Sequence, residues 1–241
     1  AEPKKIGIPH LRNVLIAYSR RATHIGYCQA MNIVTATLCF YMQEEEAFWT
    51  LSAICEDIVK DYYLEGLQLI GSIVDLNTFV SLVAHYFPEL NKHFIHLECP
   101  IETLTLPWFM CFFLGYIPQA ASLTVLDLVF AFGKNVLFQV GLAVFALCRD
   151  RLLAANDPED IAQIIKKGVT DNLKLMDIAL DRFGNLHEEG LAELSKSNKY
   201  SFMDSMQKQI DKKRIGLLSK QYPSVALQIE GLLGGFNKVA M

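Results

Sequence analysis

Charged residues are scarce in this sequence, and basic residues are not in excess. Charged side chains make up 20% of its 241 residues, and the formal net charge is −4. Because nucleic-acid binding relies on lysine and arginine side chains that neutralise phosphates, we expect no nucleic-acid partner. Apolar residues reach 52%, which excludes a disordered chain and predicts a large core.

Closely spaced cysteines are also absent. The six cysteines, at positions 28, 39, 55, 99, 111 and 148, form no CxxC pair, so the ligand spacing typical of zinc sites is missing. No secretory leader precedes them, and most lie in apolar stretches. We expect free, buried thiols in a reducing cytosol, and no metal.

Strand-like alternation of apolar and polar residues is missing as well, and we find no internal repeat. Leu11, Val14, Leu15 and Tyr18 instead follow the spacing of one helix face. The expected fold class is therefore all-α. Helices are predicted over 11–18, 29–42, 44–54, 72–87, 90–97, 104–114, 123–132, 136–153, 161–167 and 173–183.

Two regions are predicted from composition. A helical domain is expected over 1–184, with the apolar helix 136–153 at its centre. Beyond Gly184 the sequence becomes more polar, so 185–241 is expected to be a C-terminal amphipathic helical extension.

One long segment lacks charge altogether. No charged residue occurs between Thr103 and Leu126, which is long enough to cross a bilayer. Pro107 and Pro118 interrupt it, and its purely apolar part, 106–117, suits a buried helix better. A helical protein associated with membranes through this segment remains an alternative.

The most informative motif is Tyr27-Cys28-Gln29, within the run 25–32. A primary amide has both an acceptor and a donor, so it can hold a water through its oxygen and contact a phosphate oxygen through its NH2. Taken alone, Tyr27 and Gln29 would be a loop tyrosine and a helix-capping polar residue rather than catalytic groups, because short motifs recur by chance.

Several blocks in order, with the motif among them, resemble the C-terminal two-thirds of a TBC domain, the all-helical activator of Rab GTPases. The blocks are 11–18, 25–32, 44–51, 67–79, 86–90, Pro107-Trp108-Phe109 and Leu126-Asp127. The resemblance implies an irregular multi-helix bundle of TBC type that lacks its N-terminal part in this chain.

The same resemblance implies a function in vesicle trafficking. The chain would be a GTPase-activating protein for a Rab-type GTPase, a regulator rather than an enzyme with its own substrate. Gln29 would enter the GTP hydrolysis site in trans, and Tyr27 would position it or contact the GTPase. GTP and Mg²⁺ would belong to the partner, with no cofactor here. The expected location is cytoplasmic, transiently at endomembranes, through the GTPase only.

Two departures from the TBC pattern bear on activity. The family's arginine-finger motif, Ile-x-x-Asp-x-x-Arg, lies further upstream of the glutamine than this chain extends; Arg12, Arg20 and Arg21 lack its surroundings. The alternative function is thus a catalytically impaired module that binds a Rab as effector or scaffold. Ala30 replaces a common glycine, and we expect a helix start to accept either residue.

The sequence also predicts structural roles for several residues. Trp49 and Trp108 are expected to be core anchors, together with the clusters Phe112-Phe113 and Phe130-Phe132. Asp75 and Asp127, on mostly apolar helices, are expected to form a cap or a buried pair.

Overall fold

The computed structural model describes residues 7–63, 69–186 and 188–221, and within them it contains only helices. The all-α prediction is confirmed. The elements are α1 (Ile8–Arg21), α2 (Met31–Tyr41), α3 (Glu44–Ala53), η1 (Ile54–Ile58), α4 (Ile70–Tyr86), α5 (Pro88–His96), α6 (Ile101–Met110), α7 (Gln119–Phe132), α8 (Asn135–Leu153), α9 (Pro158–Gly168), α10 (Asn172–Asp177), η2 (Ile178–Arg182) and α11 (Glu188–Gln221). η1 and η2 are single π-helical turns.

Local sequence explains where several of these helices begin. Three glutamates open α3, and the backbone N–H of Gln43 donates to Glu46 at 2.9 Å. α9 begins with a proline, and the Asp157 carboxylate accepts from the Asp160 N–H at 2.8 Å. Both arrangements satisfy donors that a helix start leaves free, and they place negative charge at the positive end of the helix.

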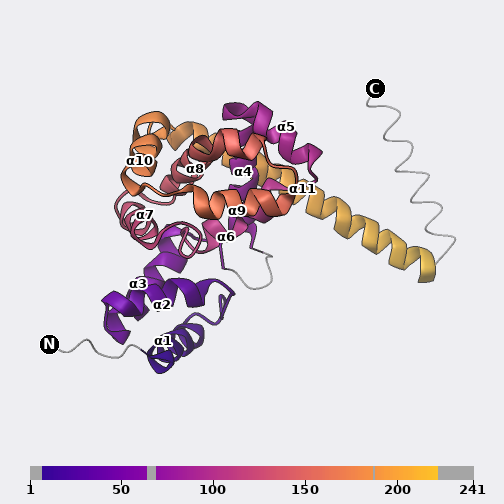
Figure 1. The fold of residues 1–241 in the computed structure, drawn as a ribbon. Coiled ribbons are helices and arrows are strands. Elements are labelled where there is room, and N and C mark those ends of the chain that lie inside the picture. The colour runs from indigo at the N-terminus through magenta and orange to yellow at the C-terminus, as the bar shows by residue number, and fades with distance from the viewer. Residues whose placement is uncertain (1–6, 64–68, 187, 222–241) are drawn as a thin grey trace. The chain divides into compact units, whose positions relative to one another are not determined.

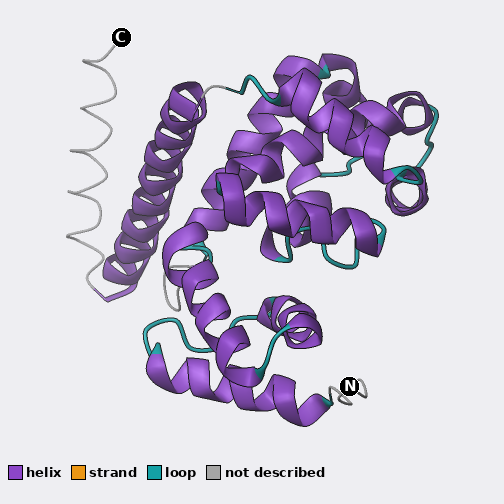
Figure 2. Cartoon of the chain, turned by 90° about the vertical axis from the view of Figure 1, so that its left-hand side faces the viewer, coloured by secondary structure: helices purple, strands orange, loops and turns teal. Residues whose placement is uncertain are grey.

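The chain divides into two units, Ala1–Ser195 and Lys196–Met241. In the first unit α1, α2 and α3 pack against one another, and α8 is contacted by α4, α5, α6, α7, α9 and α10 (Figures 1 and 2). The second unit contains the later part of α11, whose described side chains are mostly exposed.

The helix α8 is buried on nearly all sides, as its apolar sequence predicts. The Phe145 ring on α8 lies 5.7 Å from the Phe79 ring, 5.6 Å from Phe94 and 5.7 Å from Trp108. Gly141 approaches α4 so closely that an added Cβ would lie 2.7 Å from the Phe79 ring. The core of the first unit is therefore an aromatic cluster gathered around α8.

The core predictions hold in part. Trp108, Phe112 and Phe113 are buried, as expected. The prediction for Trp49 is wrong, because 54% of this residue is exposed; its ring contacts Phe48 edge-on and lies under the Arg21 guanidinium.

The core prediction for the second aromatic cluster is also wrong. Phe130 and Phe132 lie near the end of α7, and Phe132 is 71% exposed. The structural prediction for Asp127 fails too, since it is exposed on the same helix. An apolar run shows that a helix has a buried face, but α7 buries Val125, Leu126 and Val129 instead.

The uncharged segment 103–126 does not form one helix. It is divided between α6 and α7, with a turn region between them. Among the described residues no single helix is long and apolar enough to cross a membrane, although α4 and α5, bent by 115° at their junction, pass that test together on length and composition.

Asp75 forms the buried pair that the sequence predicts. The residue is 1% exposed, and one carboxylate oxygen accepts from the Tyr62 hydroxyl and from Lys134 Nζ, both at 2.6 Å. Burial raises the pKa of Tyr62 well above its usual value, so the phenol stays a donor. The network joins α4 to the segment after η1 and to the turn before α8.

We expect Asp75→Ala to lower the free energy of unfolding by about 3 kcal/mol, because it leaves a buried phenol and a half-buried ammonium without their acceptor. Denaturant titration measures this loss. The matched control is Asp127→Ala on exposed α7, which should change stability by no more than about 0.5 kcal/mol. Equal effects of the two variants would contradict a stabilising role for the network.

Candidate functional site

Tyr27 and Gln29 lie in the connection between α1 and α2, outside regular helix. A turn forms where the N–H groups of Ile25 and Gly26 donate to the Ala22 carbonyl at 2.9 and 2.8 Å. Ile25 before the motif and Met31 after it are buried. Anchored at both ends, the loop presents Tyr27, which is 57% exposed, and the exposed side chain of Gln29.

The helix predicted from Gln29 in fact begins at Met31, and the backbone before it is strained. Ala30 has φ 90° and ψ −31°, in the region that favours glycine. The expectation that a helix start accepts alanine as well as glycine is therefore wrong at this position. The sequence predicts the nearby helix but not this reversal of φ.

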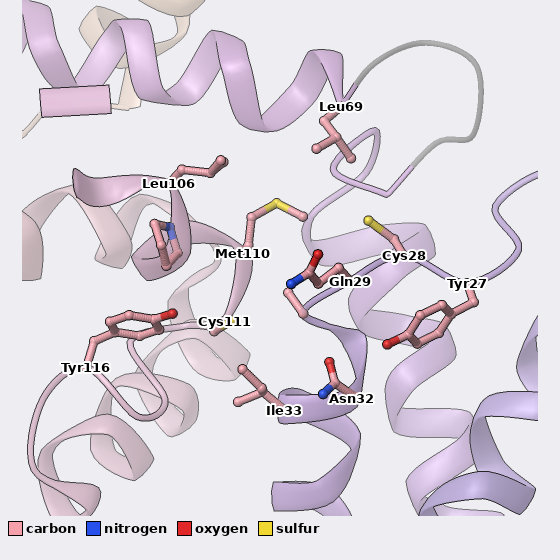
Figure 3. Close-up of a pocket in the computed structure, with 12 residues that line it drawn as sticks. Tyr27, Cys28, Gln29, Asn32, Ile33, Leu69, Leu106, Met110, Cys111 and Tyr116 are labelled. Carbon is pink, nitrogen blue, oxygen red and sulfur yellow. The ribbon is translucent and has the colours of Figure 1, made fainter. Parts of the chain in front are cut away.

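Gln29 borders a groove of about 610 Å³. One wall comes from the motif and the start of α2; the facing wall comes from α6 and the turn after it. The groove is lined by Tyr27, Cys28, Gln29, Ala30, Asn32, Ile33, Leu69, Leu106, Pro107, Met110, Cys111 and Tyr116. In Figure 3 the Gln29 amide points into this groove toward Met110, and Tyr27 and Asn32 lie on the same side as Gln29.

The Gln29 amide makes no hydrogen bond to the described part of the chain, so both its oxygen and its NH2 are available to a ligand. Ring and aliphatic carbons surround it on the facing wall. A group docked here would meet a polar amide within an otherwise mostly apolar groove.

None of the residues lining the groove is acidic or basic. Burial raises the pKa of Cys28 and of Tyr116, and raises the pKa of Cys111 to about 11. These groups are therefore neutral near pH 7, and the lining has no formal charge with which to stabilise an anion.

The arginines that precede Gln29 do not complete the site. Arg21 forms an ion pair with Glu56 and lies over the Trp49 ring, 5.4 Å from its centroid. Arg12 and Arg20 are exposed, and neither lines the groove. Among the described residues, no arginine is positioned beside the Gln29 amide.

The facing wall is the part of the site that sequence reasoning missed. The pattern over 104–114 predicts a core helix, which accounts for the buried side of α6 but not for Leu106, Met110 and Tyr116 at the groove. The helix-breaking residues Gly115 and Pro118 could have indicated this wall. They predict an irregular turn after α6, and such a turn leaves space beside the end of the helix.

Relief of backbone strain should be measurable at Ala30. We expect Ala30→Gly to raise the free energy of unfolding by about 1 kcal/mol, because the released strain exceeds the loss of one methyl group and the added flexibility of the unfolded chain. The control is Ala36→Gly, within α2, which should lower stability by about 1 kcal/mol. If both variants destabilise equally, the conformation at residue 30 is not strained. Thermal or denaturant unfolding distinguishes the results.

Cys28 should be the first cysteine to react in the native protein. It is half-buried, whereas the other five are buried. We expect iodoacetamide to label Cys28 first, at a rate that rises with pH but stays below that of a free cysteine, since burial raises the Cys28 pKa and thus lowers the thiolate fraction. Peptide mass spectrometry identifies the site, and Cys28→Ser should remove the early phase. Simultaneous labelling of several cysteines would contradict the expectation.

Known proteins resemble this chain in both sequence and fold. The Rab-GTPase-TBC domain family matches residues 1–153. The GTPase-activating protein gyp2 of Schizosaccharomyces pombe is 34% identical over 161 residues, covering 67% of this chain and 22% of that protein. Human TBC1 domain family member 2B is 31% identical over 202 residues, covering 82% of this chain and 20% of that protein.

A solved structure, the Chlamydomonas flagellar RabGAP TBC domain, matches with a TM-score of 0.60 and 26% identity, covering 72% of this chain and 57% of that one. The chain thus spans about a fifth of the length of the curated relatives it matches. On the extent of the family match and the agreement in fold, this chain belongs to the Rab-GTPase-TBC domain family.

Proposed function

We propose that this chain is the glutamine-bearing part of a GTPase-activating protein for a Rab-type small GTPase. Gln29 would enter the hydrolysis site of the partner in trans, and Tyr27 would contact the GTPase beside it. The observation that carries the proposal is the position of Gln29, whose exposed amide is directed into a groove and has no hydrogen-bonding partner in the described chain.

The chemistry of an amide suits this task. GTP hydrolysis needs a water molecule held in line with the γ-phosphate and stabilisation of the charge that spreads over the phosphoryl oxygens. The Gln29 oxygen accepts a hydrogen bond from the water, and its NH2 donates to a phosphoryl oxygen. Because Gln29 is neutral, it orients the water but does not neutralise the charge.

Neutralisation must therefore come from a cation outside this groove. An arginine finger accelerates phosphoryl transfer by about 10³ to 10⁵, and no arginine lines the groove in the described chain. On this proposal the arginine is supplied by a part of the protein outside residues 1–241. GTP and Mg²⁺ would be bound by the GTPase, with no cofactor held here. The protein would be cytoplasmic and would reach endomembranes only through its partner.

The uncharged lining of the groove also supports a second candidate function. A module with an exposed glutamine but no arginine could dock a Rab as an effector or scaffold without accelerating hydrolysis. The two candidates differ in one measurable quantity, because both predict binding of the GTP-loaded GTPase and only the first predicts faster hydrolysis.

We expect Gln29→Ala, in the intact protein, to reduce kcat for Rab-catalysed GTP hydrolysis about a hundredfold, as for the loss of other transition-state donors. Single-turnover assays across a panel of Rab GTPases measure it. Affinity for the GTP-loaded partner should change little, because the amide acts mainly in the transition state. The matched control is Gln163→Ala, which removes another exposed amide, on α9, and should leave kcat unchanged.

Two results would refute the catalytic role. Undiminished acceleration by Gln29→Ala would make the amide a docking residue at most. Binding of a GTP-loaded Rab by the intact wild-type protein, with no acceleration of any Rab tested, would favour the effector function. Residues 1–241 alone should bind the GTPase but accelerate hydrolysis poorly, because they lack the arginine-finger motif.

A further inference from the structure

Tyr63 is a buried phenol that contacts the far wall of the groove. It follows Tyr62 in the segment between η1 and α4, and it is 3% exposed. Its hydroxyl donates to the backbone carbonyl of Met110 at 2.7 Å, across 47 residues of sequence. Burial raises the pKa of Tyr63 well above its usual value, so the hydroxyl remains a donor throughout the physiological range.

The carbonyl that Tyr63 binds needs a partner. Met110 is the last residue of α6, where the helix no longer supplies an N–H donor to each carbonyl. The next turn is irregular: Phe112 and Phe113 have φ values of 53° and 62°, and the Phe113 N–H donates to the Trp108 carbonyl. Tyr63 therefore caps the end of α6 at the residue that faces Gln29.

The same phenol lies close to the loop that carries Gln29. Together with His24 and Ile25 of that loop, Tyr63 lines a separate cavity of about 280 Å³. Tyr63 therefore contacts the far wall through the Met110 carbonyl, and it borders the loop that forms the near wall through this cavity.

We infer that Tyr63 is a positioning residue that fixes the separation between the Gln29 loop and the end of α6, through its hydrogen bond to the Met110 carbonyl. Its effect on hydrolysis rests on the proposed function, whereas its effect on the shape of the groove does not. A hydrogen bond that holds a helix end in place acts on geometry, and small displacements of a catalytic group lower kcat more than they weaken binding.

Tyr62 provides the matched control. It is adjacent in sequence and fully buried, and its hydroxyl also makes one hydrogen bond, but to the Asp75 carboxylate rather than to the groove. Because hydrogen bonds to charged groups contribute more to stability, Tyr62→Phe should destabilise the protein at least as much as Tyr63→Phe. A loss of activity that merely followed stability would then be larger for Tyr62→Phe.

The first test measures how accessible Cys28 is in the groove, and it needs no GTPase. In the intact protein, Tyr63→Phe should increase the rate of Cys28 alkylation by iodoacetamide at least fivefold, because the walls are no longer held together, while Tyr62→Phe should leave that rate within twofold of wild type. Peptide mass spectrometry assigns the labelled cysteine. An unchanged rate in Tyr63→Phe, or an equal increase in both variants, would overturn the inference.

The second test measures single-turnover hydrolysis with a responsive Rab. Tyr63→Phe should lower kcat about tenfold with KM changed less than twofold, and Tyr62→Phe should keep both values. Equal losses of kcat in the two variants would reduce Tyr63 to a general stabilising residue. If the wild-type protein accelerates no Rab, the proposed function fails, and the alkylation test alone still decides the role of Tyr63.

Discussion

The burial of α8 is the constraint on which the rest of this structure depends. Its side chains fill the centre of the first unit, and the Phe145 ring contacts Phe79 of α4, Phe94 of α5 and Trp108 of α6. Side chains packed this densely hold the surrounding helices in fixed positions. Because Trp108 lies two residues before Met110, the packing of α6 against α8 also fixes where the far wall of the groove stands.

The near wall is held in place differently, because buried residues on either side of the Gln29 loop anchor it and no helix does. Ile25 and Met31 are buried on either side of the motif, and the backbone reverses at Ala30. A loop held this way loses little further conformational entropy when a partner binds. The strain at Ala30 is the cost of presenting the Gln29 amide in one orientation, and the surrounding packing offsets it.

Sequence periodicity predicts most helices here because each has an apolar face of regular spacing, and α8 is predictable as the central helix because it is apolar all round. Two kinds of feature are not predictable in this way. Trp49 and Phe132 are large apolar residues on exposed surface, and hydrophobicity alone does not tell which face of a helix is covered. The residue type at position 30 does not indicate the positive φ of Ala30. The wall opposite Gln29 brings residues as far apart in the sequence as Ile33 and Met110 to one groove, and local patterns do not encode that proximity.

The neutral lining of the groove agrees with our proposal that Gln29 orients the water and that an arginine from elsewhere neutralises the charge. Charges interact more strongly where low-polarity surfaces exclude water, so an arginine brought beside the phosphate from elsewhere would act there at greater strength than in solvent. A basic residue within this chain's own groove would attract other anions before the GTPase arrived. Gln29 avoids this problem because an amide directs a water molecule without a net charge. The geometry of its groove therefore matters more than its electrostatics, and the Tyr63 hydrogen bond to the Met110 carbonyl is one of the contacts that set this geometry.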